Sequence, residues 1–472
     1  MKRSVTSILF ALLMANVLHA ATPNIVVIMV DDMGYGDPGC YNPESKIPTP
    51  HIDGLAKTGM RFTDAHAPGP LCHLSRYGLM TGQYPFRANP EAWRKQATIG
   101  KEQTTIASLL KTQGYHTAMV GKWHLGFHED GYDKPLPGGP VDVGFDSFFG
   151  IRASTDIPPY FYIRGNRAVQ PPTVPIKAVA SEGWSPIQGA FSRKGFISPD
   201  MQLKDVLPRF TDEAISVIEK HQTDKASNKP LMLYLAYPAP HTPWLPFPEY
   251  IGKSKASMYG DFLVMVDAMI GRVLGALDKA KLSEETLVLF TSDNGPVWYE
   301  EDVKRFGHDS SGGLRGMKAD AWEAGHRMPF IVRWPGQVAA GSLSHQTICF
   351  TDVLATLAAI TEYPRKATEG PDSHDFSGVL RGTHPSDKPV RPHLAMRSGN
   401  KFMTVRVGDW KLIDALGSGG FSNPKRIEPK PNEPIGQLYD LKNDPGETNN
   451  LYNQHPEKVR SLQATLKEIL KG

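Results

Sequence analysis

Short runs of apolar and β-branched residues alternate with stretches of helical periodicity through most of this chain. Parallel strands that helices cover on both faces have nearly continuous apolar sequences of this kind. The pattern therefore predicts an α/β fold with a large, mixed but mostly parallel sheet flanked by helices. With 472 residues, of which 40% are hydrophobic, the chain can form a large core and more than one structural unit.

Four of the apolar runs are followed directly by polar residues. The runs span 24–30, 116–120, 231–236 and 287–291. The polar residues after them are Asp31 and Asp32, Lys122 and His124, His241, and Asp293 and Asn294. Ligands of open α/β sheets bind beyond the carboxyl ends of the strands, so these side chains are expected to share one crevice. A single Asp after a strand is often only a helix cap, but four such coincidences favour a site.

The remaining segments divide the chain into parts. Helices are expected over 104–112, 208–221 and 259–279, and the Pro- and Gly-rich residues 131–200 are expected to form long excursions over the crevice. Short strands within 391–413 and 437–441 and an amphipathic helix over 456–470 predict a small antiparallel sheet with a terminal helix. The predicted organisation is a signal peptide at 1–20, a main domain at 21–388 and a C-terminal subdomain at 389–472.

The N-terminus has the pattern of a cleaved signal peptide. Lys2 and Arg3 precede an apolar run over 8–18, and the small residues Ala20 and Ala21 follow it. That run is shorter than the ~20 residues that span a bilayer, and no later segment is long enough either. The sequence therefore predicts an exported protein, periplasmic or extracellular, with no transmembrane segment.

Charge and cysteine content exclude further classes. The net charge is +3, and the scattered Lys and Arg residues give no electrostatic footprint for nucleic acid. Three cysteines, Cys40, Cys72 and Cys349, are too few for a disulfide scaffold. Either Cys40 pairs with Cys349 and leaves Cys72 for chemistry, or all three are single; the sequence leaves both open.

Cys72 and Arg76 lie four residues apart, the spacing of one helical turn. If Ser75 and Arg76 open a helix that ends near Gly82, Cys72 lies at its N-terminal end, where backbone N–H groups favour an anion such as a tetrahedral oxyanion. Taken alone, a cysteine is more often a small buried apolar residue and an arginine a surface charge.

The acids after the strands have the composition of a site for a hard cation. Asp31, Asp32, Asp293 and Asn294 supply three carboxylates and one amide oxygen, which favour Ca²⁺ or Mg²⁺ over zinc. Without a cation, three converging carboxylates would repel one another and raise their pKa values. A bound divalent ion removes that conflict and acts as a Lewis acid on a bound anion.

Several cations are expected around the same crevice. They are Arg76, Lys122, His124, His241 and Lys318. Each alone is more often structural or solvated, but positive groups, a metal and a helix N-terminus together describe a site for sulfate or phosphate esters. The sequence contains no complete phosphate-binding loop, His-Glu-x-x-His run, Gly-x-Ser-x-Gly elbow or Cys-x-x-Cys pair.

Together these segments resemble the sulfatase family of the alkaline-phosphatase-like superfamily, and the resemblance covers nearly the whole mature chain. The matching segments are 31–37, 48–53, 71–82, 121–126, 241–243, 292–295, 314–318, 323–329, 438–441 and 444–451. The resemblance implies an alkaline-phosphatase-like fold and hydrolysis of sulfate esters.

By this resemblance, a formylglycine-generating maturation enzyme would oxidise Cys72 to formylglycine. One hydroxyl of the hydrated aldehyde would attack sulfur and displace the alcohol, and the other would release sulfate as the aldehyde re-forms. Calcium, or magnesium in its place, would be bound by Asp31, Asp32, the modified Cys72, Asp293 and Asn294.

The cationic residues also receive roles from the resemblance. Arg76 and Lys122 would hold the nucleophile and neutralise charge, and His124 would assist the aldehyde hydrate. His241 and Lys318 would face the sulfate and the leaving oxygen. His241 is the expected general acid, a role that Lys318 could share.

The sequence departs from the family pattern at Leu74, where the family has Pro or sometimes Ala two residues after the modified cysteine. A smaller departure is Ala324, where Gly is usual. The leading interpretation is a sulfatase acting on sulfated glycans or aryl sulfates. The alternatives are a phosphate or phosphonate monoester hydrolase of the same superfamily, and a non-catalytic binder of sulfated glycans in which Cys72 is not converted.

Residues that could contact the substrate lie in the loop-rich regions. They are Tyr160, Phe161, Tyr162, Arg164, Trp244, Arg305 and His308. Their rings could stack on a sugar or aryl group. Simple packing of the loops is an equally good interpretation of these aromatic residues.

Overall fold

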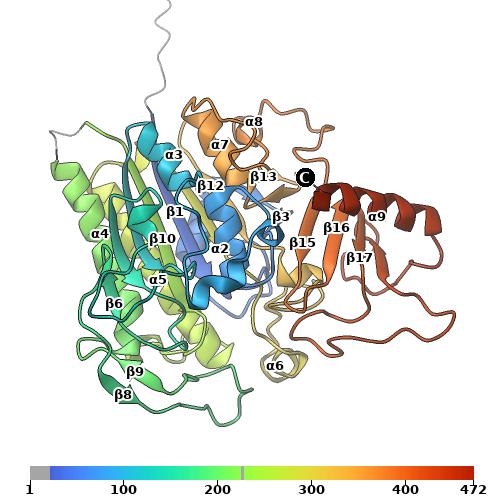
Figure 1. Ribbon diagram of the computed structural model, residues 1–472, viewed down its shortest axis with the longest axis horizontal. Coiled ribbons are helices and arrows are strands. Elements are labelled where there is room, and N and C mark those ends of the chain that lie inside the picture. The colour runs from blue at the N-terminus through green and yellow to red at the C-terminus, as the bar shows by residue number, and fades with distance from the viewer. Residues whose placement is uncertain (1–21, 225–227, 472) are drawn as a thin grey trace, which may run out of the picture.

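The computed structural model describes residues 22–224 and 228–471, so the expected signal peptide lies outside the described residues. A ten-stranded mixed sheet forms the main body, in the order β13-β2-β12-β11-β1-β10-β4-β5-β6-β7 (Figure 1). Within residues 22–224 and 228–471, no helix has both the length and the apolar composition that crossing a bilayer requires.

The centre of this sheet is parallel, as the sequence predicts. Its strands are β11 (Thr286–Ser292), β1 (Asn24–Asp31), β10 (Leu231–Pro240), β4 (His116–Lys122) and β5 (Ser147–Ile151). All residues of β1 are buried, since helices cover both faces of the sheet. The four predicted strands all occur, each extended by one or more residues.

The outer strands on both sides introduce antiparallel pairings, which make the sheet mixed, although β13 pairs with β2 in parallel. On one side lie β12 (Phe330–Arg333), β2 (Met60–Phe62) and β13 (Ser342–Ser344). On the other side lie β6 (Tyr162–Arg164) and β7 (Arg167–Ala168). These short strands came from segments whose sequences show no strand periodicity.

Two hydrophobic cores lie on opposite faces of the sheet. Alternate β1 residues contribute to each, with Ile25, Val27 and Met29 on one side and Val26, Ile28 and Val30 on the other. The first core contains residues of α2 (Cys72–Thr81), α3 (Ile106–Thr112) and α7 (Asp352–Ile360). The second contains residues of α1 (Pro50–Thr58), α4 (Val206–Thr223) and α5 (Ser257–Lys279).

The predicted helices agree with the structure to within a few residues. The later start of α3 has a clear cause, because Thr105 is its N-cap and accepts a hydrogen bond from the Ser108 backbone N–H at 3.0 Å. The remaining short elements are β3 (Ala65–His66), β8 (Val174–Ile176), β9 (Gly195–Ile197), β14 (Ile348–Cys349), α6 (Glu300–Phe306) and α8 (Ser377–Leu380).

The C-terminal part forms the predicted small antiparallel sheet with a terminal helix, to one side of the main sheet (Figure 1). Its strands are β15 (Leu394–Arg397), β16 (Met403–Val407), β17 (Trp410–Ile413) and β18 (Gln437–Asp440), and the helix is α9 (Pro456–Lys471). Val459, Leu462, Leu466 and Ile469 of α9 pack with apolar residues of this sheet in a separate core.

Buried ion pairs join this small sheet to the main body. Lys411 of β17 lies 2.9 Å from Glu323 Oε1 and 2.8 Å from Glu447 Oε1. Arg406 of β16 donates to both oxygens of Asp64 at 2.8 and 2.9 Å. Burial, together with the nearby Glu323, raises the pKa of Glu447 to about 7 despite Lys411.

The structure settles the cysteine question in favour of single thiols. Cys40, Cys72 and Cys349 are all free, so Cys40 does not pair with Cys349. Burial raises the pKa of Cys349 to about 11, which keeps this thiol protonated and unreactive.

Candidate active site

The carboxyl ends of the central strands bring the predicted polar residues together. Asp31 ends β1, Lys122 ends β4, His241 follows β10 and Asp293 follows β11, and all four are buried. Parallel neighbours place these ends at one edge of the sheet, as the sequence analysis expected.

Two residues at this edge have left-handed backbone conformations. Asp32 has a φ of 64° and His124 a φ of 59°. Such a conformation costs a non-glycine residue on the order of 1 kcal/mol and is concentrated at functional sites. The turns after β1 and β4 are therefore held in place by the surrounding structure rather than by local preference.

Helix α2 carries Cys72 as its first residue. It begins at Cys72 rather than at Ser75, the predicted start, because Leu71 is extended and its carbonyl already accepts from the Ser75 N–H at 3.0 Å. The helix ends at Gly82, whose φ of 64° suits a left-handed C-cap. Cys72 thus lies at the positive end of the helix, as predicted.

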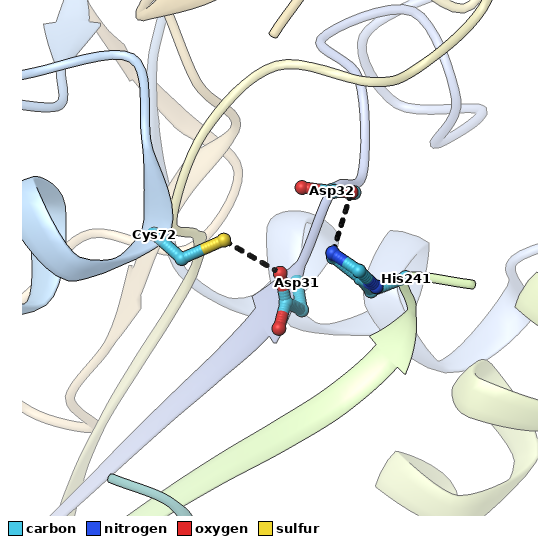
Figure 2. A group of neighbouring side chains, drawn as sticks. All are labelled: Asp31, Asp32, Cys72 and His241. Atoms are coloured by element: carbon cyan, nitrogen blue, oxygen red, sulfur yellow. Dashed lines mark hydrogen bonds and ion pairs between the residues drawn. The ribbon is translucent and has the colours of Figure 1, made fainter. Parts of the chain in front are cut away.

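The Cys72 thiol faces a carboxylate and an ammonium group. Its Sγ lies 3.3 Å from Asp31 Oδ1, to which it donates, and 3.3 Å from Lys318 Nζ. Figure 2 shows Cys72 and His241 approaching the Asp31 and Asp32 pair from opposite sides. Burial raises the pKa of the Cys72 thiol well above its ordinary value, and Asp293 and Asp31 raise it further.

Asp31 is bound by cations from two other elements. Lys122 Nζ donates to Asp31 Oδ2 and, at 2.6 Å, to Ser154 Oγ, and the Arg76 guanidinium lies 3.5 Å from the same Asp31 oxygen. Burial alone would raise the pKa of Asp31, but Lys122, His241 and Arg76 together lower it below its ordinary value. Asp31 is therefore ionised.

Arg76 joins α2 to two strand ends. Its Nε and one terminal nitrogen lie 2.9 and 2.7 Å from Asp293 Oδ2, and its other terminal nitrogen donates to the Lys122 carbonyl at 3.0 Å. Burial and the nearby Asp31 nevertheless raise the pKa of Asp293. Arg76 fixes the position of Asp293 and lies below the site rather than in its opening.

Asp32 accepts hydrogen bonds from Lys318 and Asn294. Lys318 Nζ donates to its Oδ1 at 2.5 Å, and Asn294 Nδ2 donates to the same oxygen at 2.6 Å. The Asn294 side-chain oxygen is buried and has no hydrogen-bond partner among the described residues. A buried acceptor without a donor is costly unless a ligand fills the gap.

These donors fit a hard divalent cation. One ligand atom each from Asp31, Asp32, Cys72 and His241 lies within 4.8 Å of the others. The free Asn294 oxygen adds an acceptor that still needs a positive partner. Oxygen donors dominate the set, which suits Ca²⁺ or Mg²⁺ better than a thiophilic metal.

His241 is held in one tautomer. Its Nδ1 lies 2.7 Å from the Thr242 carbonyl and therefore carries the proton, because a carbonyl can only accept. Its Nε2 then faces Asp32 Oδ2 at 3.6 Å. The Nε2 nitrogen therefore points toward the site.

His124 offers two ring nitrogens without partners. Both are buried and lack a hydrogen bond among the described residues, and the ring stands edge-on to Trp93 with centroids 4.2 Å apart. Burial lowers the pKa of His124 well below its ordinary value, and Lys122 and His73 lower it further. The ring is therefore a neutral imidazole able to accept or donate one hydrogen bond.

A pocket of about 240 Å³ opens over these groups. Of the predicted site residues, Asp32, Cys72, His124, His241 and Lys318 line it. Other lining residues were not predicted as site residues from the sequence, among them His73, Trp93, Arg94, Ser154, Asp156 and Arg193. Ser154 and Asp156 come three and five residues after β5, within the stretch 131–200 that was expected to form loops, so the strand-end rule did not select them. Trp93 and Arg94 carry no such signal.

The predicted ring-stacking residues lie elsewhere. Tyr160, Phe161, Tyr162 and Trp244 are buried in cores, and none of the seven candidates lines the pocket. Arg164 pairs with Glu213, Arg305 stacks on Trp184, and His308 Nε2 lies 2.8 Å from Asp37. Packing of the loops, the alternative interpretation, accounts for them.

Comparison with known proteins places this arrangement in a family. The model of the family described as Sulfatase matches residues 23–363. An N-acetylgalactosamine-6-O-sulfatase of Bacteroides thetaiotaomicron is 33% identical, covering 96% of this chain and 94% of the relative. Human arylsulfatase A is also 33% identical, covering 94% and 86%. A solved structure from the study of glycosaminoglycan metabolism by Bacteroides thetaiotaomicron has a TM-score of 0.83 and 32% identity, covering 96% of this chain and 100% of its own.

The chain therefore belongs to the sulfatase family, and its enzyme class is that of the sulfuric ester hydrolases.

Proposed function

We propose that this protein is a calcium-dependent sulfatase that hydrolyses O-sulfate esters of glycans through a formylglycine formed at position 72. One observation carries the proposal: the Cys72 side chain begins a helix and lies 3.3 Å from both Asp31 Oδ1 and Lys318 Nζ. A nucleophile there has a metal-binding acid on one side and a cation for the sulfate on the other.

The metal would be held by Asp31, Asp32, Asp293, Asn294 and the modified residue 72. Calcium at these oxygens would supply a Lewis acid for an oxygen of the bound ester. Lys122, Arg76 and Lys318 lie against Asp31, Asp293 and Asp32 and balance the charge of these three carboxylates. A divalent cation would then be balanced by a sulfate monoester and an ionised nucleophile together.

Residue 72 would act as a geminal diol. Its hydrated aldehyde would supply one hydroxyl for attack on sulfur, which would displace the alcohol, and a second whose deprotonation would release sulfate as the aldehyde re-forms. The unpartnered nitrogens of His124 line the same pocket and would take up the proton of that second hydroxyl. The α2 N-terminus favours the negative charge that develops on the nucleophile.

Cations on the floor and wall of the pocket would stabilise the transferring group. Lys122 and Arg76 pair with Asp31 and Asp293 and hold these carboxylates in place on the floor. Lys318 reaches the pocket beside Cys72 and would bind a sulfate oxygen. Such preorganised charge is worth most in a buried site with little water.

His241 would protonate the leaving oxygen. In-line displacement requires the nucleophile and the leaving group on opposite sides of sulfur, and His241 lies across the aspartate pair from Cys72 (Figure 2). Its Nδ1 is engaged by the Thr242 carbonyl, so Nε2 is the nitrogen free to deliver a proton. Lys318 contacts the Cys72 thiol, so it would stabilise negative charge on the sulfate rather than protonate the leaving oxygen.

The substrate proposed is a sulfated glycan, with the 6-O-sulfate of N-acetylgalactosamine as the first to examine. The 33% identity to an N-acetylgalactosamine-6-O-sulfatase over nearly the full chain supports this choice. Aryl sulfates would serve as small model substrates, as the similarity to human arylsulfatase A indicates.

The proposal also includes maturation, export and domain roles. A formylglycine-generating enzyme would convert Cys72 before folding, since the folded chain buries this residue. Export through the signal peptide at 1–20 would bring the protein to glycans outside the cytoplasm. Residues 21–388 would form the catalytic domain, and 389–472 the smaller subdomain that supports it.

Matched aryl sulfate and aryl phosphate esters test the activity. Protein coexpressed with a maturing enzyme, assayed with calcium, should release alcohol from the sulfate at least tenfold faster than from the phosphate. The Cys72→Ala variant should release none. Preference for the phosphate would support the monoesterase alternative, and glycan binding without sulfate release by converted protein would support a non-catalytic binder.

A further inference from the structure

The short 3-10 helix at Pro90–Arg94 covers one wall of the pocket with two side chains that the mechanism does not use. Trp93 and Arg94 both line the pocket, and Trp93 meets the His124 ring edge-on at 4.2 Å. The Arg94 Cζ lies 4.6 Å from the Trp93 ring centroid, within cation–π range. Arg94 is exposed, and its guanidinium packs on the Trp93 ring at the mouth of the pocket.

Arg94 stands out among the arginines near it. Arg152 pairs with Glu129, Arg193 with Asp156, and Arg397 with Glu91. No carboxylate of the described residues lies within 4.0 Å of the Arg94 guanidinium. Each of these three acids pairs with another arginine, and Arg94 has no carboxylate partner of this kind among the described residues.

The surroundings of Arg94 are unfavourable for a lone cation. Partial burial lowers its pKa, and the positive charges of Arg193 and Arg152 lower it further, against a smaller opposite effect of Asp156. The Arg152 guanidinium also donates to the Arg94 carbonyl at 2.7 Å, which fixes the backbone here. A ligand anion would relieve this repulsion without any rearrangement of the chain.

We propose that Arg94 binds a second anionic group of the substrate, a carboxylate or a further sulfate on the sugar that leaves. The inference rests on the proposed function, because it assigns the sulfate undergoing hydrolysis to the inner part of the pocket beside Cys72 and Lys318. The preferred substrate is therefore a polyanionic saccharide rather than a singly charged ester. A planar guanidinium suits either anion, since both can accept two parallel hydrogen bonds.

The test compares matched substrates on converted full-length protein. One is a sulfated disaccharide containing a uronic acid, the second is the same disaccharide with the carboxylate reduced to an alcohol, and the third carries a second sulfate in place of the carboxylate. The preference is the kcat/KM of a dianionic substrate divided by that of the reduced substrate. Arg94→Gln should lower this ratio about tenfold for both dianionic substrates. The loss should lie mainly in KM and shrink at high salt.

Arg460→Gln is the control, because Arg460 is an exposed arginine on α9 outside the pocket, and it should change no ratio. If Arg94→Gln lowers the preference only for the substrate with the carboxylate, or only for the one with the second sulfate, that result identifies the anion that Arg94 binds. Equal losses for all three substrates, or none, would overturn the inference while the wild-type turnover still upholds the sulfatase activity.

Equilibrium binding makes the inference independent of turnover. Unconverted wild-type protein, titrated calorimetrically with the uronic acid disaccharide and its reduced form, should bind the former more tightly. Arg94→Gln should remove most of that difference. Binding that does not distinguish the two saccharides in the wild type would contradict the role of Arg94 even if no sulfate ester is hydrolysed.

Discussion

Leu74 is the residue at which this chain departs from its family, and the structure explains why proline would fit there. Leu74 is the third residue of α2, and the first hydrogen bond of that helix comes from the Ser75 N–H to the Leu71 carbonyl. A proline in the first turn sacrifices no helical hydrogen bond. Leu74 itself is buried, and a methyl group on Gly69 would lie 2.8 Å from its Cβ.

We expect Leu74→Pro to increase the fraction of Cys72 that is converted to formylglycine, because the variant restores the usual motif. The lost packing should reduce the free energy of unfolding by about 1–2 kcal/mol. Peptide mass spectrometry of residue 72 measures the converted fraction. Leu74→Val serves as a control for the altered side chain, and an equal fraction in wild type and Leu74→Pro would show that the departure has no consequence.

His241 and Lys318 are distinguished by leaving-group chemistry. If His241 is the general acid, His241→Ala should lower kcat about 10²–10⁴-fold for a sugar sulfate, whose alcohol needs a proton to leave. It should lower kcat far less for an aryl sulfate with an acidic phenol. Lys318→Ala should lower both rates to a similar degree. If His241→Ala lowered kcat equally for the sugar sulfate and the aryl sulfate, another residue would be the general acid.

At the residue scale, prediction succeeded where position along a strand determines position in space. Asp31, Lys122, His241 and Asp293 follow apolar runs, and parallel pairing brings them together. The pocket wall could not be predicted in this way. Arg94 comes from a short 3-10 helix whose place depends on tertiary contacts with α2 and with Arg152, which no local pattern encodes.

Among the secondary-structure elements, the segment after Lys318 links the site to the small sheet. Asp320 is fully buried and accepts hydrogen bonds from the backbone N–H groups of Met317 at 2.9 Å and Ser422 at 3.1 Å. Phe421, next to Ser422, lines the pocket. Burial raises the pKa of Asp320 from 3.8 to about 6 and outweighs these hydrogen bonds.

This shift has a defined effect on stability. The pKa of Asp320 is about 3.8 in the unfolded chain and about 6 in the folded protein, so the protonated carboxyl stabilises the fold. This stabilisation is complete below about pH 4 and is lost as the pH rises through about 6. Between about pH 4 and pH 7, the free energy of unfolding of the wild type should fall relative to that of Asp320→Asn by up to about 3 kcal/mol. Urea denaturation across this range measures it, and parallel curves for the two proteins would contradict the shift.

Elements with strong periodicity were predictable, and those determined by caps or edges were not. The buried strands and the helices α4, α5 and α9 were predicted because their apolar residues recur with a clear strand or helix pattern. The start of α2 was misplaced because Leu71, an unremarkable residue, ends the extended segment before Cys72. The outer strands β2, β6, β7 and β13 are two or three residues long, which is too short for a periodic pattern.

Over the whole molecule, the metal site ties together strand ends that are distant in sequence. Calcium bound by Asp31, Asp32, Asp293 and Asn294 would link β1 to β11 and stabilise the folded state by mass action. At a free concentration of 100 times the Kd, that linkage is worth about 2.7 kcal/mol. We expect a chelator to lower both the melting temperature and the sulfatase activity, and calcium to restore both.

Asp32→Asn is the matched variant for that measurement. It keeps the size of the side chain and removes one charged ligand, so its melting temperature should respond much less to calcium. The same rise with calcium in the variant and the wild type would place the ion at another site.

The most direct measurement relates turnover to the chemical state of residue 72. Protein prepared with different amounts of a formylglycine-generating enzyme is assayed for aryl sulfate hydrolysis, and the mass of the peptide that contains residue 72 gives the converted fraction of each preparation. We expect the rate to rise in proportion to the converted fraction and to vanish in protein that carries only the thiol. Full activity in protein whose Cys72 is uniformly unmodified would contradict the proposed mechanism.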